Sequence, residues 1–306
     1  MEDVGLSTVL LAMLAGAIRV STPFLFVALG ECLTEKSGRI NLGLEGTLVF
    51  GAMAAYAISF ETGSPWLGVL VAGFAGMAFG AMHGAICRLK GVNDIAIGIA
   101  MMLFGTGLAF FFGKAYIQPV APRLPSVELG FWTDNPHLAK ALEVNPLFLI
   151  GIALAVAMWW AFKNTRIGLV VRTTGDSAPA ALALGINVDL VRFLATSAGG
   201  FLAGVGGAFL SLYYPGSWTE GLSSGQGLMA VALVIFARWN PLACFGAALL
   251  FGAAGALGPA LQSVGITRGY HFFNAAPYAM TLVIMILSIS PKRSLKGAPG
   301  ELSITK

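Results

Sequence analysis

The most regular feature of the chain is a series of long apolar runs separated by short polar segments. The runs are continuously apolar rather than alternating, so they predict helices and not the strands of a membrane barrel. A helix needs about 20 mostly apolar residues to cross a bilayer. We therefore expect an all-α polytopic membrane fold with about nine transmembrane helices, at residues 6–30, 42–60, 66–87, 94–112, 146–162, 190–210, 226–238, 242–262 and 275–290.

Two of these runs depart from a simple span. The first contains Arg19 and Pro23, so we expect a kink there. Two half-helices that form a hairpin remain an alternative for this run. The run at 226–238 is short for a membrane crossing.

The composition agrees with this pattern. Hydrophobic residues make up 57% of the chain and charged residues 10%, and the mean hydropathy is +0.82. A soluble domain carries roughly 25% charged residues, so we expect residues 1–306 to form a single transmembrane domain. No basic stretch is interleaved with aromatic residues, which leaves nucleic-acid binding without support. Cys32, Cys87 and Cys244 lie in or beside apolar runs and predict packing rather than disulfides.

The positions of Lys and Arg predict the orientation, because cytoplasmic loops of membrane proteins are enriched in both. With the loop at 163–189 inside, one side holds Lys36, Arg39, Arg88, Lys90, Lys163, Arg166, Arg172, Arg192, Arg238, Lys292, Arg293, Lys296 and Lys306. The other side holds Lys114, Arg123, Lys140 and Arg268. We expect the N-terminus outside and the C-terminus in the cytoplasm. The proline-containing segment 113–145 is then an ordered external loop with one short helix.

Two polar residues lie at the start of the second run, Asn41 and Glu45. A charged side chain at the bilayer centre costs roughly 2.5–3.5 kcal/mol, and less near an end of the helix. Either these side chains line a substrate pathway, or they form a hydrogen-bonded latch between helices. Arg19 is a candidate partner for Glu45 because it also lies within a run.

Other polar and small residues have structural interpretations. His83 has no second ligand at helical spacing, so it predicts packing and no metal site. Asn93 and Asp94 predict the cap of a helix. Glycines repeat at every fourth position at Gly76, Gly80 and Gly84 and again at Gly200 and Gly204, a spacing that predicts closely packed helices.

The segment from Lys163 to Arg192 carries the most specific pattern. Its alanine-rich part, from about Ser177 to Leu184, predicts two helical turns that start at Asp176 and end at Gly185. The order T-R-x-G-L-x-x-R, then G-[DE], A-A and G-I, resembles the coupling segment of permeases from ABC importers for branched-chain amino acids, ribose and nucleosides.

Residues 30–46 narrow this resemblance. They read GECLTEKSGRINLGLEG and are similar to a signature of the nucleoside (simple sugar) branch, as are the stretches 210–216, 225–227, 236–241 and 277–282. Two departures stand out: the coupling-segment proline, Pro179, falls one position late, and Met102 stands where that branch often has Asn.

The resemblance implies a type II importer permease in the bacterial inner (cytoplasmic) membrane, surrounded by lipid. It implies three partners: a second homologous permease, an ABC ATPase, and a substrate-binding lipoprotein or periplasmic binding protein. It also implies candidate substrate-pathway residues, namely Asn41, Glu45, Met102 and Phe104. The residues expected to couple to the ATPase are Arg172, Gly175, Asp176, Ala180, Ala181, Gly185 and Ile186.

Two other classes of membrane protein fit the sequence less well. An ion-coupled secondary transporter needs intramembrane carboxylates, for which Glu45 is the candidate, and leaves the segment 163–189 unexplained. An intramembrane enzyme needs a grouped nucleophile and base or a ligand cluster, and the sequence shows none at helical spacing. The phosphate-loop pattern is absent, since Gly113-Lys114 is followed by Ala115. We therefore expect no enzyme activity and no cofactor. The resemblance implies import of nucleosides, with a simple sugar or other small polar solute as the alternative.

Overall fold

The structure, a computed structural model, describes residues 6–134, 138–139, 142–263, 273, 275–288 and 297–304. Nearly all of this is helical. The helices are α1 (Leu6–Lys36), α2 (Leu44–Thr62), α3 (Pro65–Ile86), α4 (Asp94–Gly113), α6 (Pro146–Asn164), α7 (Arg166–Asp176), α8 (Ala178–Ala183), α9 (Val188–Leu212), α10 (Gln226–Phe236), α11 (Pro241–Ser263), α13 (Ala276–Ser288), and the 3₁₀ helices η1 (Lys114–Tyr116) and η2 (Gly300–Ile304). Strands β1 (Val127–Glu128) and β2 (Glu143–Val144) form one short antiparallel pair.

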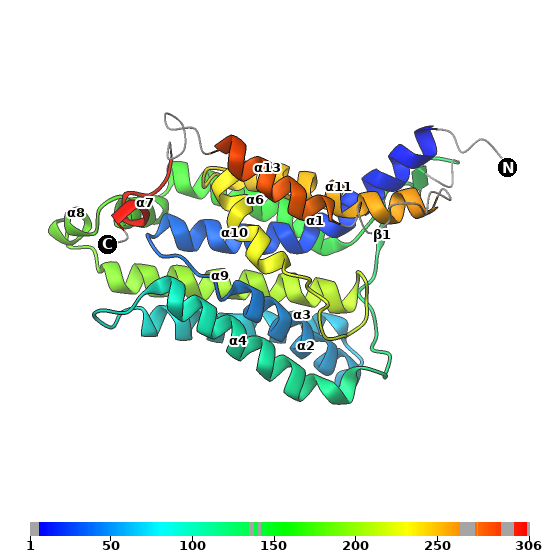
Figure 1. The fold of residues 1–306 in the computed structure, drawn as a ribbon, viewed down its shortest axis with the longest axis horizontal. Helices are drawn as coiled ribbons and strands as arrows, with labels where there is room; N and C mark the ends of the chain where they lie inside the picture. The colour runs from blue at the N-terminus through cyan, green and yellow to red at the C-terminus, as the bar shows by residue number, and fades with distance from the viewer. Residues whose placement is uncertain are drawn as a thin grey trace.

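The long helices run side by side along the long axis of the molecule (Figure 1). Helices α1 and α9 lie in the middle and pack against each other. Helices α2, α3 and α4 lie on one side of this pair, and α6, α10, α11 and α13 lie on the other. Helix α9 packs against α2 and α3, and α1 packs against α11, so the central pair joins the two groups.

Small residues set the distance between α9 and α3. A Cβ added to Gly200 would lie 2.2 Å from the carbonyl oxygen of Gly76, and one added to Gly204 would lie 2.0 Å from that of Ala72. Any side chain there would meet backbone, which cannot turn aside. The glycine spacing in the sequence correctly predicted this close packing.

Six helices of the described chain are long and apolar enough to cross a membrane. They lie at Met13–Lys36, Pro65–Ile86, Asp94–Tyr116, Pro146–Asn164, Val188–Leu212 and Pro241–Gln262. The predicted count of nine is not confirmed: the candidate at 42–60 forms α2 and is largely buried in the protein, α10 has only 11 residues, and α13 is described for 13. The orientation count also used Lys140, Arg268, Lys292, Arg293, Lys296 and Lys306, which lie outside the described residues.

The first apolar run is one helix and not a hairpin. Helix α1 continues through Pro23 and ends at Lys36, six residues beyond the predicted end. Just before the proline, the hydroxyls of Ser21 and Thr22 both donate to the carbonyl oxygen of Ile18, 3.0 Å away. Figure 1 shows the dark-blue start of α1 bending away from the line of the rest, as expected at a proline.

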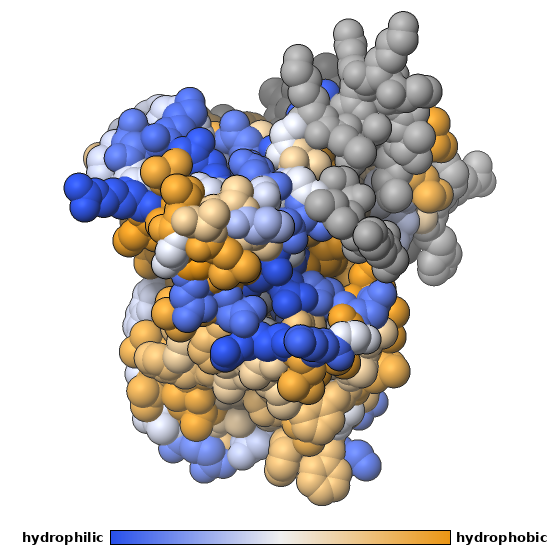
Figure 2. Space-filling model, turned by 90° about the vertical axis from the view of Figure 1, so that its left-hand side faces the viewer, coloured by the Kyte–Doolittle hydropathy of each residue, from blue (hydrophilic) through white to orange (hydrophobic). Residues whose placement is uncertain are grey.

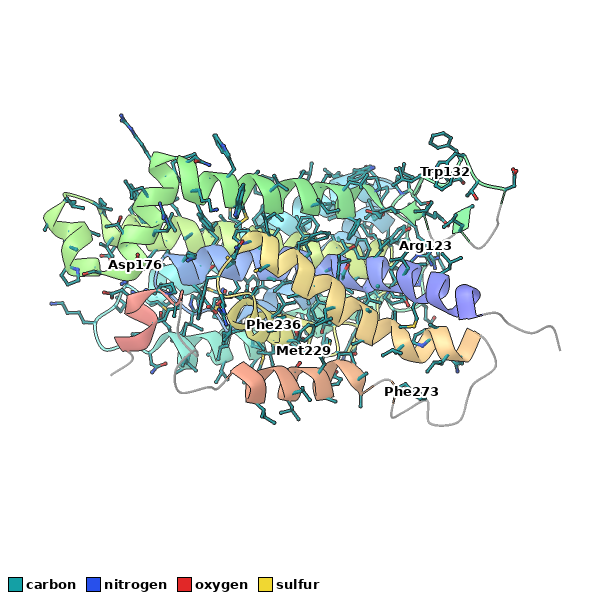
Figure 3. The ribbon with its side chains drawn as sticks, turned by 90° about the horizontal axis from the view of Figure 1, so that it is seen from above. Arg123, Trp132, Asp176, Met229, Phe236 and Phe273 are labelled. Atoms are coloured by element: carbon teal, nitrogen blue, oxygen red, sulfur yellow. The ribbon has the colours of Figure 1, made fainter. Side chains whose placement is uncertain are left out.

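The two long loops lie at opposite ends of the bundle. Helices α7 and α8 and the described C-terminal segment occupy one end, and β1 lies at the other, near the start of α1 (Figure 1). Figure 3 shows the same separation, with Asp176 far from Arg123 and Trp132. The described part of the segment 113–145 contains η1, which directly continues α4, helical residues at 138–139, and the β1–β2 pair.

Candidate functional site

Glu45 ties the start of α2 to the start of α10. Its carboxylate accepts hydrogen bonds from the hydroxyl of Ser223 at 2.5 Å, the backbone N–H of Gly225 at 3.1 Å and that of Gly227 at 2.6 Å. A carboxylate is stabilised there by the free N–H groups and the positive end of the helix dipole. The side chain is thus fully engaged as a latch between two helices.

Arg19 is not the partner of Glu45, contrary to expectation. Its guanidinium lies 3.8 Å from the carboxylate of Glu143, on strand β2. Both residues are partly exposed near that end of the bundle. The sequence placed Arg19 and Glu45 in neighbouring runs, but could not show that they lie at different heights along the bundle.

Asn41 shapes the turn between α1 and α2. Its backbone N–H donates to Glu31 Oε1 at 2.8 Å, and its side-chain oxygen accepts from the N–H of Gly43 at 2.9 Å. The residue is buried. Asn41 therefore closes a local turn that leads the chain directly into the Glu45 latch.

Sequence reasoning missed two buried carboxyl groups near the C-terminal end of α1. Glu31 contacts Asn41 as described, and Glu35 accepts a hydrogen bond from the indole N–H of Trp239. Both are almost completely buried. The available signal was their spacing of one helical turn inside the 30–46 signature. The first apolar run was predicted to end at residue 30, so this spacing lies beyond the predicted helix.

Met102 and Phe104 lie on α4, next to the turn that precedes α2. A Cβ on Gly46 would lie 2.5 Å from the carbonyl oxygen of Met102, so α4 crosses α2 one residue beyond Glu45. Phe104 is 50% exposed and is the outermost of three neighbouring rings. The centroids of Phe50 and Phe79 are 5.0 Å apart, and those of Phe79 and Phe104 are 6.0 Å apart.

The start of α4 confirms the predicted cap. The side-chain oxygen of Asn93 accepts from the N–H groups of Ile95 at 2.9 Å and Ala96 at 3.1 Å. Asp94 forms a 2.6 Å ion pair with Arg39, which also donates to the carbonyl oxygen of Cys87. The cap therefore also fastens the α1–α2 turn to α3 and α4.

His83, on α3, contacts the same turn. Its Nε2 is 3.2 Å from the carbonyl oxygen of Ile40 and 3.6 Å from Cys87 Sγ. The ring is buried between helices, which agrees with the packing interpretation. Among the described residues, no group of three or more His, Cys, Asp or Glu side chains is placed to hold a metal ion.

The segment at 163–189 forms two helices rather than one. The predicted start at Asp176 is wrong: Asp176 ends α7, and Ser177 caps α8 by accepting from the N–H of Ala180 at 3.3 Å. A serine hydroxyl caps a helix as well as a carboxylate does, so the composition alone left two candidates. Gly185 adopts a left-handed conformation, with φ of 76°, and ends this helical segment as predicted.

The seven candidate coupling residues divide by exposure. Asp176, Ala180 and Gly185 are exposed, and Arg172 and Ile186 are partly exposed. Ala181 and Gly175 are buried against their own chain, and a Cβ on Gly175 would lie 2.2 Å from the carbonyl oxygen of Lys36. Leu182 and Leu184, which the sequence did not single out, are 61% and 71% exposed.

These exposed leucines lie on the end of the molecule that Figure 2 shows face on. Hydrophilic residues spread over this end, and hydrophobic side chains lie among them. The two leucines, one on the short, capped helix α8 and one at its C-cap, form a small apolar patch among hydrophilic residues. We refer to α7 and α8 together as the candidate docking surface.

A family model for the "Branched-chain amino acid transport system / permease component" matches residues 13–289. The chain belongs to this family. It is a multi-pass membrane protein and a transport subunit. Because permeases of this kind work with an ATPase and a substrate-binding protein, the chain is one part of a larger transporter.

Three relatives are similar over most of their length. A putative glucose ABC transporter permease, TsgC13 of Haloferax volcanii, is 34% identical over 261 residues, covering 83% of this chain and 79% of the relative. The nucleoside ABC transporter permease NupC of Lactococcus lactis is 27% identical and covers 92% and 94%. The guanosine ABC transporter permease NupQ of Bacillus subtilis is 29% identical and covers 87% and 88%.

Proposed function

We propose that this permease forms half of the membrane pathway of an ABC importer for nucleosides. The observation that carries the proposal is the 30–46 signature, whose polar residues form the turn and latch between α1, α2 and α10. NupC and NupQ, which match nearly the whole chain, add support.

Import of a simple sugar is the second candidate. The relative with 34% identity is named as a putative glucose permease. Met102 also departs from the Asn of the nucleoside branch, which removes one polar contact from the expected path. A nucleoside contains a pentose, so the two substrate classes share hydroxyl groups and differ in the base.

The base is the part of the substrate that the aromatic residues of α4 would recognise. We propose that Phe104 stacks on the base and that Met102 lines the path beside it, while Asn41 and Glu45 hold the neighbouring backbone in place. Phe104 is half exposed and backed by Phe79, so its ring has a free face on a rigid support. Offset aromatic stacking of this kind contributes about 0.5–1.5 kcal/mol.

The α7–α8 surface is proposed as the ATPase contact. Its exposed residues are Asp176, Ala180, Leu182, Leu184 and Gly185, with Arg172 and Ile186 at the edge. Buried Ala181 and Gly175 seat the two helices on the bundle. With this end in the cytoplasm, the N-terminus lies outside, and the protein belongs in the bacterial inner membrane with a second homologous permease beside it.

The test is uptake of radiolabelled guanosine and uridine in cells with and without this chain. Glucose, ribose and free bases are added separately as competitors. Uptake that requires the chain and is competed by nucleosides alone is the expected result. Competition by glucose or ribose, with no effect of nucleosides, would replace the nucleoside proposal with the sugar alternative.

A further inference from the structure

The C-terminal segment packs against the two helices of the candidate docking surface. Helix η2 lies beside α7 in Figure 1. A Cβ on Gly300 would lie 2.3 Å from the carbonyl oxygen of Asp176, so the segment approaches the end of α7 as closely as backbone allows. Leu302 and Ala298 pack against the hydrophobic core.

Glu301 joins the two ends of this arrangement. Its Oε1 accepts from the backbone N–H of Ala178, the first residue of α8, at 2.8 Å. Its Oε2 accepts from the guanidinium of Arg192, in the first turns of α9, at 3.0 Å. One carboxylate therefore connects the short docking helix to the long central helix.

Arg192 extends the connection to the end of α1. Its Nε donates to the carbonyl oxygen of Ser37 at 3.1 Å. Gly38 fits between the two charged side chains, since a Cβ there would lie 3.0 Å from both Arg192 and Glu301. The following residue, Arg39, is the one paired with Asp94, so the contacts continue to α4.

The ion pair between Glu301 and Arg192 is shielded from water and can transmit a displacement of α8. The side chains of Arg192 and Glu301 are 13% and 18% exposed, so water competes little for the pair. Hydrogen bonds between charged groups are shorter and stronger than neutral ones. Helix α8 has only six residues and one buried side chain, Ala181. Few of its own side chains therefore hold it against the bundle.

We propose that Glu301 is a positioning residue that transmits the movement of α8 to α9 and to the α1–α2 turn. The inference rests on the proposed function, because it assumes that an ATPase moves α8. When the ATPase displaces α8, the carboxylate draws Arg192 with it, and both central helices move as one body. Without the carboxylate, α8 moves alone and ATP is hydrolysed without transport.

The experiment uses the complete importer, with this chain, its partner permease, its ATPase and its binding protein in liposomes. ATP hydrolysis and uptake of radiolabelled guanosine are measured in the same sample for wild type, Glu301→Ala and Arg192→Ala. We expect each variant to keep hydrolysis and to lose uptake about tenfold, the effect of one charge-assisted bond. Glu220→Ala, which removes an exposed carboxylate elsewhere, is the matched control and should leave both rates unchanged.

Arg192→Ala separates transmission from a merely local cap. It leaves the bond between Glu301 and Ala178 in place and breaks only the connection to α9 and α1. Because both residues belong to one link, the double variant should be no worse than either single variant. Independent roles would multiply, giving a loss of about a hundredfold.

Three results would overturn the inference. These are an unchanged ratio of uptake to hydrolysis in Glu301→Ala, a multiplicative double variant, or loss of hydrolysis and uptake in equal proportion. If Glu301→Ala fails to accumulate in the membrane, Glu301→Gln retains an acceptor for Ala178, weakens the charged bond, and should show a smaller change in the same ratio. Wild type that hydrolyses ATP but does not import guanosine would contradict the proposed substrate and not the link.

Discussion

Helices α9 and α4 are both long enough to span a membrane, yet they occupy opposite kinds of position. In the most apolar stretch of α4 only 22% of the residues are buried in the protein, although its mean hydropathy is 2.2. The corresponding values for α9 are 72% and 1.5. The more hydrophobic helix is therefore the more exposed one.

The difference follows from the solvent. Lipid tails are as apolar as leucine, so burying an apolar side chain between helices in a membrane gains little from the hydrophobic effect. Helix α9 is buried because its glycines permit backbone contact. Helix α4 carries large side chains on its free face, among them Leu103, Phe111 and Phe112.

The largest effect should come from breaking the close packing of α9. Gly204→Leu would push a side chain into the backbone of α3, where a Cβ alone would lie 2.0 Å from a carbonyl oxygen. We expect the protein to disappear from the membrane fraction, because overpacking typically costs 1–3 kcal/mol even where side chains can adjust. Immunoblots of membranes measure this.

The matched control is Gly107→Leu on α4, where a Cβ would meet no heavy atom within 4 Å. It should accumulate as wild type does. Equal losses in the two variants would mean that any leucine in place of a helix glycine is harmful, and the contrast between the two helices would be lost.

A second prediction extends the comparison from small residues to charges. Glu45→Ala removes the acceptor of three hydrogen bonds and should lower the free energy of unfolding by about 3 kcal/mol. Exposed Glu220, in the loop that leads to α10, should change stability by less than about 0.5 kcal/mol when replaced by alanine. Thermal unfolding in detergent distinguishes the two. A Glu45→Ala protein as stable as wild type would show that the three hydrogen bonds of Glu45 do not stabilise the fold.

A third prediction concerns an exposed apolar residue outside the bundle. Leu182→Arg should leave folding intact, because the side chain is 61% exposed, and should weaken binding of the ATPase by about 30-fold, the effect of a typical interface hot spot. Co-purification of the ATPase is the measurement. Thr219→Arg, exposed near the other end, should have no effect on it. Normal co-purification of the Leu182→Arg protein would exclude α8 from the contact.

The smallest effect should distinguish two phenylalanines on the exposed face of α4. Phe104→Ala should reduce guanosine uptake about 3- to 10-fold through lost stacking, with unchanged protein level. Phe112→Ala, at a similarly exposed site two turns later, should leave uptake near wild type. Equal rates in both variants would show that the α4 face does not discriminate substrate.

Much of the fold was predictable because it depends on local sequence. The apolar runs, the cap at Asn93, the glycine spacing and the left-handed Gly185 that follows α8 each involve residues within a turn or two of one another. The same holds for the motif that carried the resemblance. Errors arose where two local solutions were equally good, as at Asp176 and Ser177. They also arose where polar residues were taken to lie beyond a helix, as at Glu31 and the residues after it, which belong to α1.

The partners of the buried charges were decided by the tertiary structure alone. Ser223 lies 178 positions from Glu45, and Glu301 lies 109 positions from Arg192. A carboxylate buried in a membrane protein is stable only with hydrogen-bond donors or a cation beside it. The sequence shows which carboxylates lie within apolar runs, but not which residues supply the donors. Close backbone contacts at glycines determine which helices lie in the interior of the bundle. Those contacts exist only once α2, α3 and α9 have packed together.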